Sequence, residues 1–271
     1  MALVRMNFES IYLNNNHEIG IILPDVKRDG PQTPKEFFES GKKYKVLWLL
    51  HGTYGDYSDW IRKSNIERYA SERDLIVVMP SGLNANYANW NNAFGMGYNM
   101  YDYFLKELMP MVYNWFPASD KKEDNYIAGL SMGGMGALLF GVNHPDKFAG
   151  IASLSAPAFN LHKLDSKSES FFNLKDPRFR AMVENAGGEE AYRNTVENVW
   201  DLLPQQANKG VLPAIYCCCG TEDFLYPSYK EFEAYAKAEK LPITFVEEAG
   251  YKHEWAFWDR QIQKALEFFQ L

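Results

Sequence analysis

The sequence predicts an α/β fold with one mostly parallel central sheet and helices on both of its faces. Apolar runs of strand length alternate with helical patterns along most of the 271 residues, as in βαβ units. Most of these runs lack polar alternation, which is typical of strands that are covered on both faces. The length suits one large domain, and we treat residues 1–271 as a single unit.

The first two predicted strands form a pair. Segments 8–13 and 18–23 look like strands joined by three asparagines, and they could make an antiparallel edge. Segment 25–43 is rich in proline, glycine and charge, which predicts an exposed loop. The remaining strands are expected at the continuous apolar runs 45–50, 74–80, 125–128, 148–154, 212–219 and 243–247.

Helical patterns separate these strands. We expect helices at residues 59–71, 99–116, 132–143, 228–240 and 255–269. In the last of these, large apolar residues recur at steps of three and four and form one stripe. Residues 157–210 contain short helical pieces and no predicted strand. An insertion of this size predicts a small helical lid over one end of the sheet.

Composition excludes several classes of function. A net charge of -7 argues against nucleic acid as a partner, because a phosphate-binding face needs clustered lysine and arginine. The chain has no run of 18 apolar residues, so we expect no membrane-spanning helix. The first residues carry no basic-then-apolar signal segment, which predicts a cytoplasmic protein. The oligomeric state stays open, and a homo-oligomer is compatible with the sequence.

The three cysteines are consecutive, at Cys217–Cys219. Neighbouring residues on a strand point to opposite faces, so these thiols cannot form a metal site by themselves. They are not a disulfide framework either. We interpret them as small apolar residues of a buried strand. No other cluster has the spacing of metal ligands, so we expect neither a metal nor a cofactor.

The strongest functional signal is the sequence Gly-Leu-Ser-Met-Gly at residues 129–133. A Gly-x-Ser-x-Gly pattern places its serine on a sharp turn between a strand and a helix, where glycines leave room for the hydroxyl. Here the motif directly follows an apolar run and directly opens a helix rich in glycine and alanine. Ser131 is therefore the predicted nucleophile.

A serine hydroxyl needs a base that takes its proton, and the chain offers five histidines. His253 follows the last predicted strand, in a loop at the carboxyl edge of the sheet. In folds with this serine motif the histidine also comes last in chain order. We therefore predict His253 as the general base and acid. The other histidines are interpreted as structural: His17, His51, His144 and His162.

The base needs a carboxylate that accepts its second imidazole proton. The apolar run that ends at Gly220 is followed by Thr-Glu-Asp, which places two acids at a strand end. Asp223 is the predicted partner of the base. Glu222 is its rival, because consecutive side chains diverge and only one of them can point inward.

Acyl transfer also needs N–H groups that point toward the oxygen on which charge develops. One predicted donor is Met132, which follows the nucleophile at the positive end of its helix. The other should lie in the loop after an earlier strand, where His-Gly-Thr makes the Thr53 N–H the candidate. In this interpretation Gly52 lets the backbone turn and His51 orders the loop. A role for His51 as the base is the alternative.

Several motifs together resemble a known family. They are His-Gly-Thr-Tyr-Gly-Asp-Tyr-Ser-Asp-Trp, Val-Val-Met-Pro-Ser-Gly, Gly-Leu-Ser-Met-Gly-Gly, Gly-Thr-Glu-Asp and the final histidine. They are similar to the esterase D-like branch of the α/β-hydrolases, nearest to bacterial tributyrin esterases. That branch also contains S-formylglutathione hydrolases and the acetyl- and feruloyl-esterases of the first carbohydrate esterase family.

This resemblance runs from about residue 8 to residue 269 and is weakest at 157–210. It implies an α/β-hydrolase fold and the same site that the motifs predict. The implied triad is Ser131, Asp223 and His253, with Thr53 and Met132 at the oxyanion hole. One departure is that S-formylglutathione hydrolases usually carry Ser-Gly-Leu-Thr-Cys where this chain has His-Gly-Thr-Tyr-Gly, which disfavours a glutathione-linked substrate.

We therefore expect a serine carboxylesterase that hydrolyses small-molecule esters through an acyl-enzyme. Its substrates would carry short acyl or aryl groups, including acylated sugars and phenolic esters. Trp90, Phe94 and Trp255 are expected to contact the substrate, since rings stack on sugars and phenols. The alternatives are a thioesterase, an acyltransferase and a catalytically silent carbohydrate-binding module. The intact serine, aspartate and histidine argue against the last of these.

Overall fold

The computed structural model describes residues 1–91, 96–164 and 173–271. They form an eight-stranded sheet in the order β1-β2-β4-β3-β7-β8-β9-β10. Its strands are β1 (Ala2–Ser10), β2 (Asn15–Leu23), β3 (Val46–Leu50), β4 (Ile76–Pro80), β7 (Asn125–Leu130), β8 (Gly150–Leu154), β9 (Ala214–Gly220) and β10 (Ile243–Glu248). Strand β2 is antiparallel to β1 and β4. The other six strands of this sheet run parallel to one another: β4, β3, β7, β8, β9 and β10. The predicted antiparallel edge is therefore confirmed.

The first hairpin is longer than the sequence predicts. Strand β1 already pairs with β2 at Ala2, whereas the prediction began at Phe8. Polar residues such as Arg5 and Asn7 alternate with apolar ones in this edge strand, and one of its faces is exposed. That alternation hides the strand from a search for continuous apolar runs.

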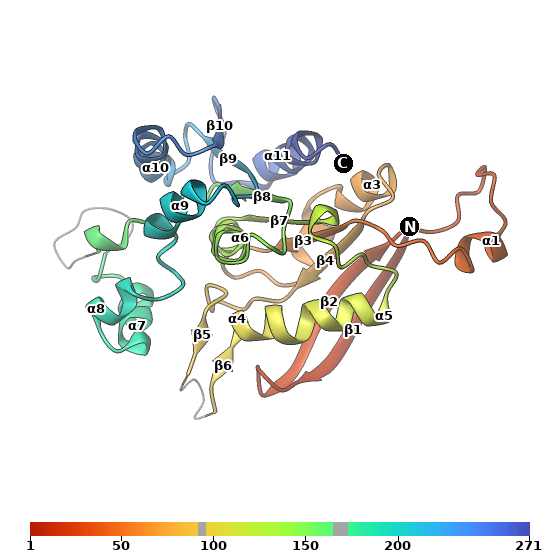
Figure 1. Cartoon of the computed structure of the whole chain (residues 1–271), viewed down its shortest axis with the longest axis horizontal. Coiled ribbons are helices and arrows are strands. Elements are labelled where there is room, and N and C mark those ends of the chain that lie inside the picture. Colours follow the sequence, from red (N-terminus) through yellow and green to blue (C-terminus); the bar gives the residue numbers. More distant parts are fainter. Residues whose placement is uncertain (92–95, 165–172) are drawn as a thin grey trace.

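Helices cover both faces of the sheet, as predicted (Figure 1). The first face carries a long helix made of α4 (Met100–Asp102), a π-helical segment (Tyr103–Leu108) and α5 (Met109–Trp115). Helices α6 (Met132–Asn143), α9 (Val199–Asn208) and α10 (Tyr226–Ala238) pack on the same side. The opposite face carries α2 (Asp59–Lys63), α3 (Ile66–Ser71) and α11 (Trp255–Phe268).

Two predicted segments need correction. The expected helix 59–71 is divided at Ser64, whose backbone is extended and whose hydroxyl donates to the carbonyl of Trp60. A serine side chain that satisfies the last carbonyls competes with continuation of the helix. The expected loop 25–43 contains the short helix α1 (Pro34–Phe38), which Thr33 and Glu36 begin with a capping box.

The sequence patterns did not predict a small hairpin. Strand β5 (Asn89–Trp90) pairs with β6 (Tyr98–Asn99), and Asn99 N–H donates to the carbonyl of Tyr12 in the turn of the first hairpin. Asparagine is depleted in strands, so the sequence of this hairpin reads as a loop.

The insertion between β8 and β9 is helical, in agreement with the expectation for residues 157–210. It contains a 3₁₀ turn (Leu161–Lys163), α7 (Pro177–Ala186), α8 (Glu189–Arg193) and α9. Its first helices form a small apolar cluster of their own around Phe179, Met182 and Tyr192. Helices α7 and α8 lie at the end of the molecule opposite α1 (Figure 1).

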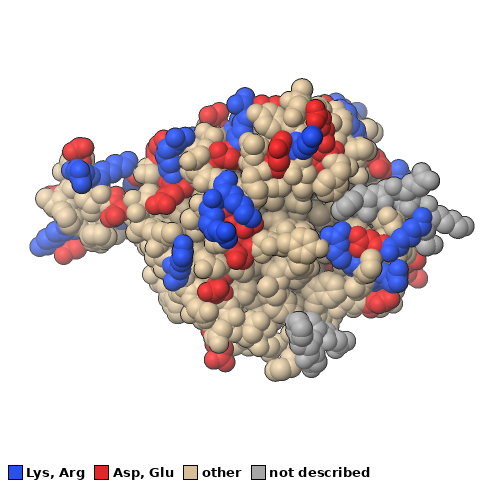
Figure 2. Space-filling view, turned by 180° about the vertical axis from the view of Figure 1, so that it is seen from behind, with Lys and Arg blue, Asp and Glu red and all other residues tan. Residues whose placement is uncertain are grey.

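The surface carries charged side chains of both signs (Figure 2). Figure 2 shows acidic and basic side chains interleaved over one face of the molecule. Within the described ranges, no helix combines the length and the apolar character that crossing a bilayer requires. The three cysteines lie in β9 and are buried, as their interpretation as apolar strand residues predicts.

Candidate active site

Ser131 occupies a sharp turn between β7 and α6. Its backbone has φ 51° and ψ −123°, a combination that residues other than glycine rarely adopt. The flanking glycines make the turn possible by close backbone approach. A Cβ on Gly129 would lie 2.3 Å from the carbonyl carbon of Gly133, and a Cβ on Gly133 would lie 2.5 Å from Leu50 O. The turn thus presents the serine hydroxyl at the carboxyl edge of the sheet.

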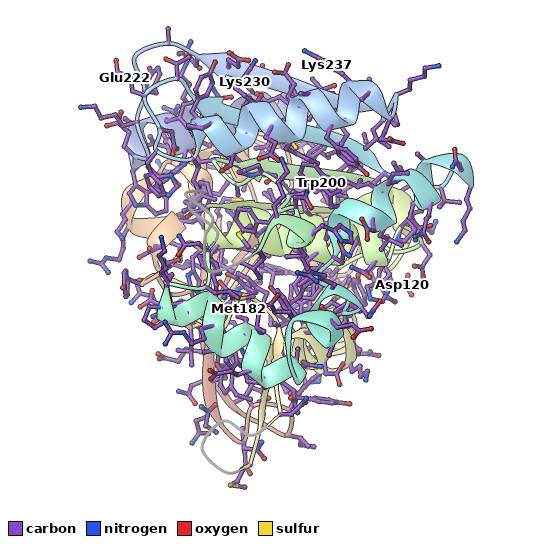
Figure 3. The ribbon with its side chains drawn as sticks, turned by 90° about the vertical axis from the view of Figure 1, so that its left-hand side faces the viewer. Asp120, Met182, Trp200, Glu222, Lys230 and Lys237 are labelled. Carbon is purple, nitrogen blue, oxygen red and sulfur yellow. The ribbon has the colours of Figure 1, made fainter. Side chains whose placement is uncertain are left out.

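The structure brings the predicted serine, histidine and aspartate together. Ser131 Oγ lies 3.0 Å from His253 Nε2, and His253 Nδ1 lies 2.8 Å from Asp223 Oδ2. The Asp223 side chain is fully buried, and its other oxygen accepts the N–H of Leu225 at 2.9 Å. Glu222 is exposed and lies at the outer edge of the molecule (Figure 3). Of the two acids, only Asp223 contacts the histidine.

Aromatic rings fix the position of the His253 ring. The ring of Phe224 lies 4.6 Å from it and that of Trp258 lies 4.9 Å from it in an edge-on arrangement. The Trp258 N–H donates to Ser155 Oγ at 3.0 Å, which holds the indole in place. Sequence reasoning missed these two contacts, although Phe224 adjoins the predicted acid and Trp258 lies on the apolar stripe of the last helix.

His51 holds the loop that follows β3. Its Nδ1 lies 2.6 Å from Gly52 O, and its Nε2 accepts the N–H of Gly82 at 2.6 Å. Burial lowers the pKa of His51, so the ring is neutral with its proton on Nδ1. Both ring nitrogens are occupied by backbone groups of the loops at residues 52 and 82. This geometry matches the interpretation of His51 as a residue that orders the loop.

The two predicted oxyanion donors lie beside the serine. Thr53 and Met132 line one small cavity together with Ser131. Met132 is the first residue of α6, so its N–H has no acceptor within the helix and lies at the positive end of the helix dipole.

The remaining histidines have other partners. His17 packs edge-on against Tyr103 in the core, where burial lowers its pKa to about 4. His144 bonds to the hydroxyl of Tyr101 at 2.7 Å. His162 bonds to Asp201 at 2.7 Å in the insertion.

Two cavities of different size meet at Ser131. The larger is an open cleft of about 850 Å³ that His253, Trp255 and the exposed Tyr54 help to line. The smaller holds about 40 Å³ and is lined by Met132, Met135, Phe159 and Phe179 among others. Ser131, Thr53, Arg178 and Phe224 line both cavities.

The predicted substrate contacts have different positions. Trp255 lines the large cleft, edge-on to Trp60 and Trp258. Trp90 is not among the residues of that cleft, and its indole N–H donates to Ala85 O under the insertion. The tryptophan thus braces a loop. Phe94 lies outside the described residues.

The chain is similar to known hydrolases over nearly its whole length. An acetyl esterase from Caldicellulosiruptor saccharolyticus is 30% identical over 275 residues, which cover 99% of this chain and 98% of that protein. The structure of a fluorophosphonate-binding serine hydrolase of Staphylococcus aureus is 31% identical, with a TM-score of 0.78 over 99% of this chain and 98% of the other. An S-formylglutathione hydrolase from the same organism is 32% identical, with a TM-score of 0.79 and the same coverage.

The strand order, the serine turn and these likenesses define an α/β-hydrolase fold. The model of the family described as "Putative esterase" matches residues 27–269, so the chain belongs to this esterase family and is a carboxylic ester hydrolase. The predicted resemblance to esterases is thereby confirmed.

Proposed function

We propose that the protein is a serine carboxylesterase in which Ser131, His253 and Asp223 form the catalytic triad. Ser131 Oγ attacks the ester carbonyl while His253 takes its proton, and Asp223 stabilises the imidazolium. The N–H groups of Thr53 and Met132 stabilise the oxyanion. His253 then protonates the leaving alcohol and activates a water molecule that hydrolyses the acyl-enzyme. The observation that carries this proposal is the continuous hydrogen-bonded series from Ser131 through His253 to Asp223.

The two cavities support an assignment of the two halves of the substrate. The general acid must reach the leaving oxygen, and His253 lines the large cleft but is not among the residues of the small cavity. The leaving group therefore belongs in the large cleft. The acyl group belongs in the small cavity, beside Met132.

Cavity size favours a short acyl chain over an aryl group. A volume of about 40 Å³ exceeds the volume per molecule in liquid water. It is far below the roughly 150 Å³ of a cavity that holds benzene. Acetyl and butyryl groups fit this description better than feruloyl groups. The cleft for the leaving group is more than large enough for a sugar, and the exposed rings of Tyr54 and Phe224 lie at its wall.

A thioesterase is the second candidate. The supporting observation is the 32% identity with an S-formylglutathione hydrolase over nearly the whole chain. A wide leaving-group cleft also accommodates a thiol carrier. The same triad would act, with sulfur in place of the leaving oxygen. A non-hydrolytic acyltransferase is less favoured, because the cleft at Ser131 is open and admits water.

The test compares acyl and leaving groups in one series. The substrates are p-nitrophenyl acetate, butyrate and octanoate, methyl ferulate, and acetyl and formyl thioesters of glutathione. We expect turnover of the short esters, slow turnover of ferulate, and loss of at least 10³-fold with Ser131→Ala. Ser40→Ala, at an exposed serine next to α1, is the matched control. Equal activity of Ser131→Ala and wild type would overturn the proposed nucleophile.

The proposal also includes a cytoplasmic location. The three unpaired cysteines, Cys217–Cys219, are compatible with a reducing compartment. Cell fractionation with an antibody against the native chain tests this part.

A further inference from the structure

A second cavity adjoins the small cavity at Ser131, and we call it the inner cavity because Ser131 is not among its residues. It also holds about 40 Å³. The two cavities share the side chains of Asn86, Met135 and Phe159 as a common wall. Met135 is on α6, one turn beyond Ser131, and its unbranched side chain can change rotamer at little cost. A chain attached to Ser131 that grows past the first cavity would therefore enter the second.

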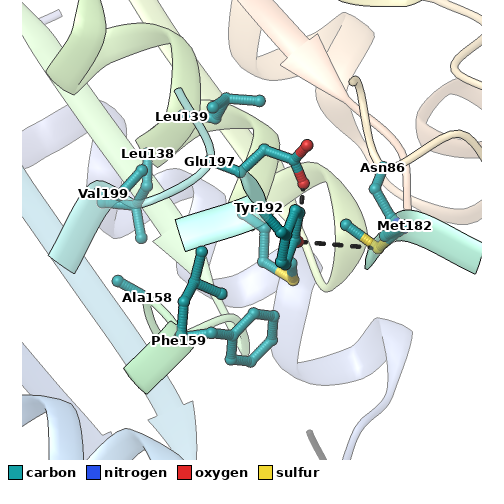
Figure 4. A pocket seen from close by; sticks show the side chains of 11 residues that line it. Asn86, Leu138, Leu139, Ala158, Phe159, Met182, Tyr192, Glu197 and Val199 are labelled. Atoms are coloured by element: carbon teal, nitrogen blue, oxygen red, sulfur yellow. Dashed lines mark hydrogen bonds between the residues drawn. The ribbon is translucent and has the colours of Figure 1, made fainter. Parts of the chain in front are cut away.

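The inner cavity is lined mostly by apolar side chains, and its polar residues are Asn86 in the shared wall and Tyr192 and Glu197. Its apolar walls come from α6, from the segment after β8 and from the insertion: Leu138, Leu139, Ala158, Leu161, Met182 and Val199. The carboxyl group of Glu197 and the hydroxyl of Tyr192 lie together in its wall (Figure 4). The Tyr192 hydroxyl donates to Glu197 Oε2 at 2.8 Å. Met182 points from α7 toward the same hydroxyl (Figure 4).

The carboxyl group of Glu197 has unused capacity for hydrogen bonds. A carboxylate offers about four acceptor positions, and Tyr192 fills one of them. Within residues 1–91, 96–164 and 173–271, no lysine, arginine or histidine forms an ion pair with Glu197. Burial raises the pKa of Glu197 to about 7, so the protein holds this group in surroundings that disfavour its charge. An apolar side chain would fill the same space without that cost.

We propose that the inner cavity is the far end of the acyl site and that Glu197 selects unbranched acyl chains that carry a terminal hydroxyl group. This inference rests on the proposed function, because it requires the acyl group to be attached to Ser131. The terminal hydroxyl donates to the free positions of the Glu197 carboxyl. An unsubstituted chain of equal length would cover the carboxyl without replacing the hydrogen bonds that water gives it, and sites built to bond a hydroxyl reject such analogues.

The size of the cavity limits which hydroxylated groups fit. A flexible chain can extend through both cavities, of about 40 Å³ each, whereas an aromatic ring needs a single cavity of roughly 150 Å³. A phenolic hydroxyl on a ring is therefore disfavoured. The expected ligand class is a flexible ω-hydroxyacyl group.

The experiment compares matched methyl esters. The acyl chains have six, seven or eight carbons and end in a methyl, a hydroxyl or a methoxy group. We expect wild type to favour the hydroxyl by roughly 10- to 100-fold in kcat/KM over the methyl at the length that reaches Glu197. The methoxy ester should gain nothing, because it has no proton to donate.

Two variants isolate the carboxyl group. Glu197→Leu should reverse the preference toward the methyl-ended chain, and Glu197→Gln should reduce it if the leucine variant does not fold. Glu190→Leu, at an exposed position of α8 in the same insertion, should leave the ratio unchanged. A hydroxyl-to-methyl ratio near one in wild type would overturn the inference. So would a ratio that both Glu197 variants leave unchanged.

The outcome also separates this inference from the proposed function. If wild type hydrolyses methyl-ended esters through Ser131 but ignores the terminal hydroxyl, only the role of Glu197 is wrong. If no ester or thioester of any length is hydrolysed, the proposed function fails and the inference fails with it.

Discussion

The substitution Glu197→Gln is expected to raise the free energy of unfolding, relative to wild type, by more at pH 8 than at pH 5. Burial raises the pKa of this carboxyl from 4.5 to about 7. Between these two values the folded chain binds more protons than the unfolded chain. The contribution of this proton to the unfolding free energy is fully present below the pKa of Glu197 in the unfolded chain. It is lost as the pH rises through the pKa of Glu197 in the folded chain. Glutamine has no such titration, and its carbonyl can still accept the hydroxyl proton of Tyr192.

The size of the effect follows from the two pKa values. A tenfold difference in proton affinity corresponds to about 1.4 kcal/mol, so the whole loss in wild type is roughly 3 kcal/mol of unfolding free energy. The unfolded carboxyl is already mostly ionised at pH 5. The part of the loss that falls between pH 5 and pH 8 is therefore about 2.5 kcal/mol.

Urea unfolding followed by tryptophan fluorescence measures this effect. The quantity to compare is the difference in unfolding free energy between Glu197→Gln and wild type at each pH, because all other titrating groups cancel in that difference. Glu190→Gln, on the exposed surface of α8, serves as the control and should shift equally at both pH values. If the difference for Glu197→Gln is the same at pH 5 and pH 8, the carboxyl does not carry the cost of burial assigned to it.

Three further predictions concern the site and the sheet. Asp223→Asn should lower kcat by roughly 10³- to 10⁴-fold with a nearly unchanged KM, because the amide disturbs the tautomer of His253; steady-state kinetics checks this, and a loss below tenfold would contradict it. Gly133→Ala should destabilise the fold by about 2 kcal/mol or more, since its Cβ would lie 2.5 Å from Leu50 O; an unchanged melting temperature would argue against this close approach. Burial raises the pKa of the thiols of Cys217–Cys219, so a thiol reagent should modify none of them in the native protein and all three in urea; rapid modification of the native protein would exclude this burial.

The positions of the predicted triad could be inferred from sequence because each residue follows a recognisable strand. Parallel strands deliver their carboxyl ends to one edge, so Ser131 after β7, Asp223 after β9 and His253 after β10 were expected to be neighbours. Their hydrogen bonds fit that expectation. The catalytic roles remain proposals that mutagenesis must test.

The residues of the inner cavity could not be inferred in the same way. Glu197 belongs to the insertion, in a segment without a motif, and it lines the inner cavity together with residues of α6 and α7. Burial of a carboxyl depends on tertiary packing that local patterns do not encode. Trp90 was predicted to contact the substrate because it is an aromatic residue in a polar loop, and the structure adds that its indole N–H donates to Ala85 O, a contact that local patterns do not encode.

The backbone of Ser131 has a practical consequence for protein engineering. Its φ of 51° with ψ of −123° is a conformation that glycine adopts with less strain than any other residue. A glycine at this position would relieve that strain and remove the hydroxyl in one step. Directed evolution that rewards heat tolerance alone would therefore enrich variants that lack the proposed nucleophile. Screens on this scaffold should select for turnover and thermal survival in the same round.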